Sequence, residues 1–361
     1  YQRRVRGMFV GLCLGQVIVI TRHGARTPYS SAANDVEYNC STLNYNFRMN
    51  GEKEAPKNRL QVRYDIHNEL KGNCVAWQLL NEGYQQHERL GKLLSRLYPG
   101  LYKGKLRSTD FTRVIMSLAG QLTEPGVVHI APWEMDSFGD SQECPSVRQY
   151  QHHHETRGAD WGNLGRIQQR IPGDWLSIGD IVAARRSSGL PIPLSEQDQL
   201  LALQQMNAAW ARVLNQNEDP VGKTVFMKIT GGKMMNVLRN LIRNGESGVI
   251  SVHDIDVAVA VAVLAQFQQT GKPDFASFVA FEINNGKVQI RFRNGPDGEG
   301  EIVDGVCGKK ECDLAEFMRV VDAFALEDNE YQQMCHMRSQ DVLRKSKKVV
   351  RVLKRQNRKT K

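Results

Sequence analysis

The chain has 361 residues, enough for one large domain or for a core domain with a sizeable insertion. Hydrophobic residues make up 41% and charged residues 24%, so we expect a packed core. The formal net charge is +9, but residues 344–361 contain ten Lys or Arg and no carboxylate. The net charge of the rest of the chain is therefore near −1. The total of +9 is thus no evidence that the body of the protein binds a polyanion.

The first predicted strand follows an apolar leader. Basic residues at 3, 4 and 6, followed by apolar residues 8–14, resemble the remnant of a signal or anchor. Residues 16–21 are β-branched and end in polar residues, which predicts a buried strand leaving its sheet. No apolar run reaches the roughly 18 residues that cross a bilayer. We therefore expect no membrane span in the visible chain, although an upstream one could have been lost.

Irregular and helical segments alternate after this strand. Residues 29–72 are polar and lack periodicity, which indicates a long excursion. Leucines at helical spacing predict an amphipathic helix over residues 77–98, ended by Pro99-Gly100. Residues 104–107 then predict a strand end, and residues 111–119 the helix that follows it.

Residues 121–193 are rich in Gly, Pro, Ser and His, which predicts an inserted lobe. Residues 195–214 predict a helix, with Ser195 as N-cap and Asp198 completing the capping box. Residues 249–252 predict a strand, and residues 255–268 the apolar helix after it.

Two alternating segments, residues 275–283 and 287–293, predict a hairpin turning at Asn285-Gly286. A last helix is expected over residues 313–324. Strands that alternate with helices predict an α/β sandwich with a largely parallel or mixed sheet. We assign residues 16–120 and 195–343 to the core, with an excursion over 29–75. Residues 121–194 form the inserted cap, and residues 344–361 a basic tail.

The basic tail is either a solvated terminus or a cationic arm for sulfated glycan, nucleic acid or an acidic membrane surface. No aromatic residue lies among its basic residues, so nothing there would stack on bases. We therefore keep a polyanion contact as an alternative and expect no nucleic-acid partner.

The seven cysteines lack the close paired spacing of a zinc site, and Cys307 with Cys312 is a weak metal signal. An odd number leaves at least one free thiol, for which Cys13 is the candidate. The other six could form three disulfides in an oxidising compartment. Asn39-Cys40-Ser41 is the only N-glycosylation sequon, which favours a secretory glycoprotein.

Charged residues gather at the ends of three predicted strands. In open α/β sheets the carboxyl ends of the strands face the ligand crevice, so residues placed there converge on one site. The three groups are Arg22/His23/Arg26, Arg107 with Asp110, and His253/Asp254.

This set of side chains suits a phosphate monoester. Arginine forks bind phosphate oxygens bidentately, so Arg22, Arg26 and Arg107 would form a cradle. An imidazole between two arginines has a lowered pKa because a further cation is disfavoured there. His23 would therefore stay neutral in mild acid and attack phosphorus, forming a phosphohistidine.

The leaving alcohol needs a proton, and Asp254 is placed to be that general acid. Its pKa should rise beside bound phosphate. His253 would be a fourth phosphate donor, and Gly24 would let the backbone turn close to the ligand. Singly, these residues fit a solvated turn or a helix cap. Together, three such groups favour a site.

Arg-His-Gly-x-Arg-x-Pro at residues 22–28, Arg-Ser-Thr-Asp at 107–110 and His-Asp at 253–254 resemble the histidine acid phosphatase family of the histidine phosphatase superfamily, over roughly residues 16–338. The resemblance implies a phosphoglycerate mutase-like three-layer α/β/α sandwich with an inserted, mainly helical cap. It implies His23 as nucleophile, Asp254 as proton donor, and Arg22, Arg26, Arg107 and His253 as phosphate ligands, without metal or cofactor.

Three features resemble the 2-phosphoxylose phosphatase branch, which acts in the Golgi on the proteoglycan linkage region. They are residues 144–150, the Cys40/Cys74 pair, and Tyr331 followed by Cys335-His336. This resemblance implies the disulfides Cys40–Cys74, Cys144–Cys335 and Cys307–Cys312. It also implies a Golgi location, luminal or membrane-bound if an anchor has been lost, with a lysosomal or secreted protein as alternatives.

Two details bear on the subfamily. His-Asp at 253–254, in place of His-Ala-Glu, points away from the phytase-like inositol phosphatases. Ala25 stands where the general acid phosphatases usually have an aspartate, which should make the arginine cradle more electropositive.

The leading hypothesis is an acid phosphomonoesterase acting on phosphorylated glycan. One alternative keeps the chemistry but takes lysophosphatidate or small phosphomonoesters, and another is a degenerate phosphatase that only binds phosphorylated ligands. His152–His154 suggest a metal site, but adjacent histidines in a loop cannot easily face one ion, so we expect a solvated surface.

Overall fold

The computed structural model describes residues 15–29, 35–40, 70–131, 144–155, 159–214, 220–265 and 271–336. The apolar leader with Cys13, most of the 29–72 excursion and the basic tail lie outside these residues. Among the described helices, none is long and apolar enough to cross a membrane.

A mixed sheet forms the centre of the molecule, with strand order β3-β2-β4-β1-β5-β6-β7 and β8 paired to β6. Strands β3, β2, β4 and β1 are parallel, whereas the remaining neighbours pair antiparallel. The predicted hairpin is confirmed, because Asn285 and Gly286 both have positive φ between β5 and β6. The strand bounds are β1 Gln16–Arg22, β2 Lys105–Ser108, β3 Val128–Ile130, β4 Gly248–Val252, β5 Phe278–Asn284, β6 Lys287–Arg293, β7 Glu301–Val303 and β8 Glu311–Asp313.

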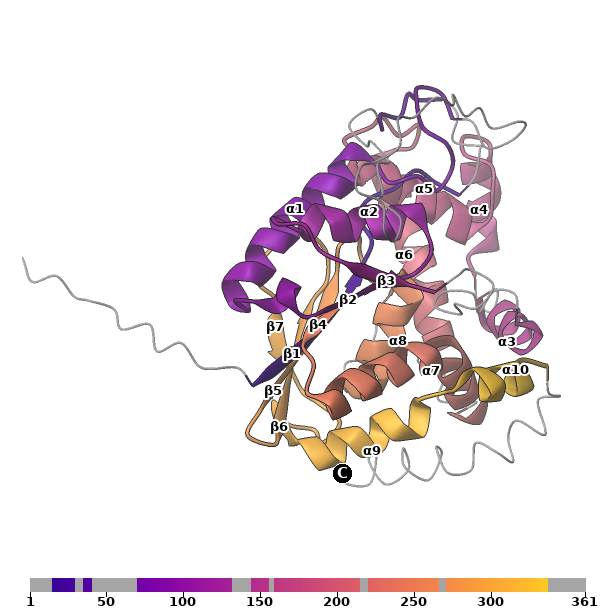
Figure 1. Ribbon diagram of the computed structural model, residues 1–361. Coiled ribbons are helices and arrows are strands. Elements are labelled where there is room, and N and C mark those ends of the chain that lie inside the picture. Colours follow the sequence, from indigo (N-terminus) through magenta and orange to yellow (C-terminus); the bar gives the residue numbers. More distant parts are fainter. Residues whose placement is uncertain are drawn as a thin grey trace, which may run out of the picture.

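Helices cover both faces of the sheet, as Figure 1 shows. Successive side chains of a strand point to opposite faces. Val17 and Val19 of β1 thus pack toward α1 (Asn81–Leu97) and α2 (Thr112–Gln121). Ile18 and Ile20 instead join the core that includes α7 (Pro220–Asn244), α8 (Asp254–Leu264) and α9 (Leu314–Phe324). The predicted three-layer α/β/α sandwich is confirmed, and burial on both faces explains the unbroken apolar pattern of β1.

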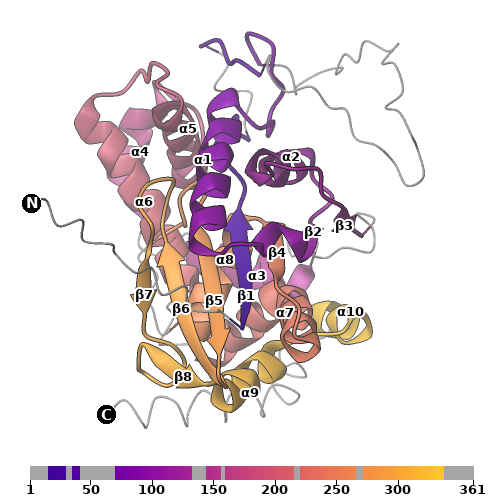
Figure 2. The ribbon, with the colours of Figure 1, turned by 60° about the vertical axis from the view of Figure 1, so that its left-hand side comes forward.

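Helices α4 (Trp161–Gln168), α5 (Trp175–Ser187) and α6 (Glu196–Leu214) share an apolar cluster of their own. In Figure 2 they lie beyond the end of β1 that carries Arg22, where a cap would cover the crevice. The expected N-cap of α6 is present, since Ser195 Oγ accepts from Asp198 N at 3.2 Å. Helices α4 and α5 lie within the predicted cap segment, whereas α6 lies in the segment assigned to the core. The division into cap and core therefore stays a prediction.

Helix α3 (Pro145–Glu155) lies in the predicted cap segment but packs against α6, α7 and α10 (Asp328–His336). The disulfide Cys144–Cys335 joins it to α10. The other two bonds are Cys40–Cys74 and Cys307–Cys312, so all three expected pairs are present. The short helix η2 (Leu101–Lys103) completes the described elements.

Two helices differ from the sequence prediction. Helix α1 begins at Asn81 rather than 77, because Trp77 has φ of 68° and Leu79 pairs with Arg26 in a β-bridge. Helix α7 was not predicted. Its Gly231-Gly232 pattern is typical of a turn, but a Cβ at Gly231 would lie 2.5 Å from Val259 of α8, so glycine allows the two helices to pack closely.

Candidate active site

The loop after β1, residues 23–28, is held by polar side chains from α1 and α2. Gly24 N donates to Ser117 Oγ at 3.0 Å, and Ala25 N donates to Gln86 Oε1 at 2.9 Å. A Cβ at Gly24 would lie 2.2 Å from the carbonyl oxygen of Gly83. Glycine at 24 is therefore required by the approach of α1. The expected close approach of this turn to a ligand stays a prediction.

His23 is fully buried at the start of this loop. Its Nδ1 lies 2.9 Å from the carbonyl oxygen of Gly24, which can only accept, so Nδ1 carries the hydrogen. The lone pair of the neutral ring is consequently on Nε2, which has no hydrogen-bond partner among the described residues. Burial, and then the charge of Arg113, lower the pKa of His23 well below its usual value. His23 is therefore a neutral imidazole with an available nucleophilic nitrogen.

Arg22 lies at the end of β1 with its guanidinium over the Phe275 ring, 4.2 Å from the centroid. Its Nη1 donates to the carbonyl oxygen of Pro273, and its Nη2 lies 3.1 Å from Asp254 Oδ2. The Nε group is buried and has no acceptor within the described part of the chain. An N–H of this kind is suited to an anion.

Arg26 makes a two-point contact with Asp180 of α5, through Nη1 at 3.0 Å and Nη2 at 2.8 Å. Burial alone would lower the pKa of Arg26, but the Asp180 carboxylate outweighs it and raises that pKa. Asp180 thus links the cap to the arginine of the loop. Nothing in the sequence pattern singled out Asp180, because its helix shows no motif.

A third arginine of the cluster is Arg113, in the first turn of α2, and the sequence analysis did not include it. Its Nη2 lies 3.4 Å from Nδ1 of His253, and its Nε has no acceptor among the described residues. Burial lowers the pKa of Arg113 to about 10. Ser117, one helical turn later, supports the His23 loop, and this spacing from Arg113 could have identified the helix face.

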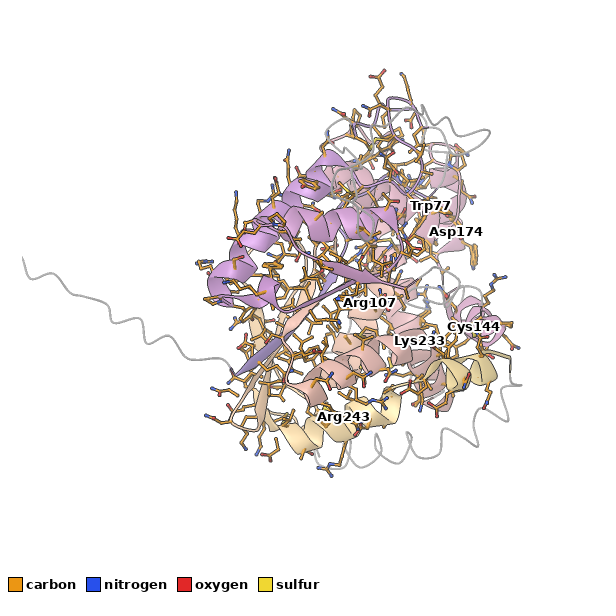
Figure 3. All side chains as sticks on the ribbon, in the orientation of Figure 1. Trp77, Arg107, Cys144, Asp174, Lys233 and Arg243 are labelled. Atoms are coloured by element: carbon orange, nitrogen blue, oxygen red, sulfur yellow. A yellow bond between two sulfur atoms is a disulfide. The ribbon has the colours of Figure 1, made fainter. Side chains whose placement is uncertain are left out.

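Arg107, expected in the cradle, is placed differently. Its Nη1 donates to the backbone carbonyl oxygens of Ser108 and, at 3.3 Å, of His129. Figure 3 shows Arg107 near β3, at the edge of the sheet. The structure thus brings together Arg22, Arg26 and Arg113, while the guanidinium of Arg107 contacts the β2–β3 edge and Asp110 is exposed.

His253 and Asp254 lie where β4 meets α8, as expected. Because Arg113 donates to His253 Nδ1, the ring hydrogen is on Nε2, which lies 3.3 Å from Thr109 Oγ1. Burial lowers the pKa of His253 well below its usual value, so it is a neutral N–H donor. Asp256 accepts from the backbone N of His253 at 3.1 Å, which makes it part of the α8 capping box.

Asp254 Oδ2 lies 3.1 Å from Arg22 Nη2 and 3.1 Å from Lys272 Nζ. Burial by itself raises the pKa of Asp254, but the charges of Lys272 and Arg22 outweigh it and hold that pKa well below its usual value. Asp254 is therefore a carboxylate in this structure. The sequence analysis missed Lys272, which follows a segment without a motif.

His152–His154 belong to helix α3 rather than to a loop. Neighbouring residues of a helix point about 100° apart, so the three backbone positions face different directions. Their side chains lie outside the described residues. Across the described residues, no group of three or more His, Cys, Asp or Glu side chains is placed to hold a metal ion.

Residues 13–121, which carry His23 and the three arginines of the site, match the model of the histidine phosphatase superfamily (branch 2). Over these residues the chain is similar to this superfamily. This similarity supports phosphatase activity, with hydrolysis of phosphomonoesters through a phosphohistidine. The chain is also similar to Counting factor 60 of Dictyostelium discoideum, with 25% identity over 90% of this chain and 89% of that protein.

Solved structures with a similar fold include phytases. The Hafnia alvei phytase has a TM-score of 0.56 at 13% identity, covering 90% of this chain and 98% of that one. The Klebsiella phytase has a TM-score of 0.55 at 12% identity, with coverage of 88% and 97%. The Citrobacter braakii phytase has a TM-score of 0.53 at 14% identity, with coverage of 90% and 100%. At these identities the likeness shows the fold alone.

The contrast between Arg113 and Arg107 gives a direct test. Arg113→Ala should lower kcat/KM for 4-nitrophenyl phosphate on the order of 100-fold, because it would remove a charged donor from the cluster around His23. Arg107→Ala is the matched comparison and should have a much smaller effect. Steady-state kinetics of the two folded variants decide between them. An equal loss in both would return Arg107 to the cradle.

Proposed function

We propose that this histidine phosphatase is an acid phosphomonoesterase with His23 as nucleophile, acting on glycan-linked phosphate such as the 2-phosphoxylose of the proteoglycan linkage region. Two observations together carry the chemistry. Nε2 of His23 has no hydrogen-bond partner among the described residues, and buried N–H groups of the neighbouring arginines lack acceptors there. Such N–H groups are costly unless an anion satisfies them. A phosphoryl group at this position would meet both the nucleophile and its donors.

In the first step Nε2 of His23 attacks phosphorus and the bond to the leaving oxygen breaks. Arg22, Arg26 and Arg113 stabilise the charge that spreads over the other phosphate oxygens, with the Nε2 hydrogen of His253 as a further donor. Asp254, once protonated, transfers its proton to the leaving oxygen. The products of this step are an alcohol and phosphorylated His23.

In the second step water attacks the phosphohistidine and the bond between nitrogen and phosphorus breaks. Asp254, now a carboxylate, accepts the proton of that water, which restores the starting proton inventory. The backbone carbonyl of Gly24 keeps the hydrogen on Nδ1 of His23 throughout. His23 therefore leaves as a neutral imidazole, with the same tautomer for the next turnover.

Two exposed aromatic residues near Arg26 support a ring-shaped leaving group. Tyr29 stacks over the Arg26 guanidinium at 3.7 Å, and its ring centroid lies 5.8 Å from that of Trp77. Trp77 Nε1 donates to the carbonyl oxygen of Tyr29, which fixes the pair. The two residues are 42% and 48% exposed, so their rings offer apolar faces on which a sugar ring can pack.

A cavity of about 450 Å³ adjoins the cluster and supports a polar leaving group. Its walls come from α1, α5, α6 and the segment before β5, and they include Arg22, Asp180 and Lys272. Basic and acidic side chains both line it, among them Arg89, Arg186, Glu82 and Asp297. This mixture suits hydroxyl groups better than the acyl chain of lysophosphatidate.

The substrate class is tested by comparing kcat/KM for a linkage oligosaccharide bearing 2-phosphoxylose with kcat/KM for lysophosphatidate. The oligosaccharide should be preferred, and Trp77→Ala should reduce its kcat/KM by up to about tenfold. Glycerol 2-phosphate, which has no ring, is the control and should be unaffected by Trp77→Ala. A preference for lysophosphatidate contradicts the glycan assignment, and no turnover of any phosphomonoester favours a binding protein.

We also propose a secretory location, in the Golgi or along a related route. It is supported by the three disulfides, because such bonds persist in oxidising compartments. The contact of the basic tail with a polyanion remains a separate proposal, since that segment lies outside the described residues.

A further inference from the structure

A continuous chain of opposite charges connects the two arginines of the His23 loop. It runs from Arg22 to Asp254, then to Lys272, to Asp180 and to Arg26. The separations are 3.1 Å, 3.1 Å, 3.4 Å and 2.8 Å in that order. Lys272 is the middle member, with one carboxylate on each side. It is thus the cation that joins the proposed acid of the reaction to the carboxylate of the cap.

Lys272 is fixed in position by its surroundings. Its backbone N donates to Asn207 Oδ1 of α6 at 3.1 Å, and a Cβ at the preceding Gly271 would lie 2.5 Å from the same side chain. The next residue, Pro273, accepts a hydrogen bond from Arg22. The Lys272 side chain is only 9% exposed, so its ammonium group is held in the site rather than in solvent.

Asp254 faces charged or titratable groups from every element around it. Arg22, His23 and Arg26 approach from β1 and its loop, Arg113 from α2, and Lys272 from the segment before β5. His253 and Asp256 belong to its own helix start, where the backbone N of Ile255 also donates to Asp254 Oδ1 at 3.0 Å. Of these groups, the three arginines and the neutral His23 have proposed roles at the phosphoryl group. Lys272 instead lies on the side of Asp254 toward Asp180.

We propose that Lys272 is a positioning residue that holds the Asp254 carboxyl and sets the pH above which proton donation to the leaving group fails. This inference rests on the proposed function, and it assigns to Lys272 the control of proton donation at that same site. In the proposed complex Arg22 is shared between phosphate and Asp254, whereas Lys272 pairs with the carboxylates of Asp254 and Asp180. It therefore acts in the substrate complex, where the proton is transferred.

The direction of the pH effect follows from the charge of Lys272. Asp254 must be protonated to donate, so kcat falls as pH rises through its pKa in the substrate complex. A cation 3.1 Å away favours the carboxylate and lowers that pKa. Removing the cation raises it, and the falling limb of kcat then moves to higher pH. A shift of about one unit is expected for the loss of one close opposite charge.

The experiment compares pH profiles of kcat for the intact protein, Lys272→Met and Lys272→Arg, with glycerol 2-phosphate as substrate. Lys272→Met should move the falling limb upward by about one pH unit, and Lys272→Arg should restore it because it keeps the charge. Lys287→Met serves as the matched control. It breaks an exposed ion pair that is not part of the site, in which Lys287 Nζ lies 2.6 Å from Asp313 Oδ1. It should leave the profile unchanged.

Two further measurements connect the effect to Asp254. In an Asp254→Asn background, profiled with 4-nitrophenyl phosphate, Lys272→Met should no longer shift the falling limb. Infrared titration of the carboxyl band gives the Asp254 pKa without turnover. The spectrum of each protein is compared with that of the same protein carrying Asp254→Asn, so that the difference belongs to Asp254. An unchanged pKa in Lys272→Met, or a shift that persists without Asp254, overturns the proposal. Activity of the intact protein on phosphomonoesters tests the proposed function separately.

Discussion

Replacement of His23 by alanine is expected to reduce turnover of 4-nitrophenyl phosphate on the order of 10⁴-fold or more. The side chain is the proposed nucleophile. Among the described histidines, His23 is the one that is buried in the cluster and has a ring nitrogen lone pair without a protein donor. His253 cannot substitute, because Arg113 occupies its Nδ1 and its Nε2 carries the hydrogen. Assays at mildly acidic pH in EDTA measure the loss.

Trapping of the intermediate gives a second observation on the same residue. Acid-labile, base-stable phosphate should be found on the intact protein after a brief reaction and should be absent from His23→Ala. His129→Ala, which changes an exposed histidine on β3, is the matched control and should retain both turnover and labelling. Full activity in His23→Ala would falsify the phosphohistidine mechanism.

The first half of the site could be predicted because its determinants are local in sequence. A strand buried on both faces reads as an unbroken apolar run, so the end of β1 and the following Arg-His-Gly were found at the right place. The His-Asp pair after β4 follows the same rule. In both cases the carboxyl end of a parallel strand delivers adjacent residues to one crevice.

The arginine of the second strand shows where this reasoning fails. A side chain within a strand points to one face of the sheet, whereas the helix after the strand turns back over its end. The sequence analysis chose Arg107, the charged residue nearest the strand end. The structure instead places Arg113, in the first turn of α2, against His253. Which of the two binds phosphate depends on the path of the chain after β2, which residue types alone do not specify.

Asp180 and Lys272 could not be found because each depends on packing between distant segments. Asp180 lies 154 residues from the arginine that it contacts, on a cap helix without a motif. Lys272 reaches Asp254 because α6 holds its backbone through Asn207. The unpredicted α7 has a similar cause, since Gly231 serves contact with α8 rather than a turn. These features follow from tertiary packing, which overrides local propensity.

Asp254→Asn should slow turnover most for the substrates whose leaving groups have the highest pKa. Asparagine keeps the shape of the side chain but has no proton to transfer. Alkyl phosphates, whose alkoxide needs that proton, should slow by about 10³-fold, whereas 4-nitrophenyl phosphate should slow by about tenfold or less. A plot of log kcat/KM against leaving-group pKa should therefore become steeper in the variant.

The control for this variant must separate catalysis from stability. Removing the Asp254 carboxylate leaves Arg22 and Lys272 without their shared partner, so some loss of folding stability is expected in any case. Such a loss would lower the activity on all substrates by the same factor, whereas loss of a general acid must depend on the leaving group. Asp256→Asn changes the neighbouring carboxyl, which caps α8, and should show no such dependence. If Asp254→Asn slows every substrate equally, Asp254 holds the arginine and lysine in place, and the leaving group must obtain its proton from another donor.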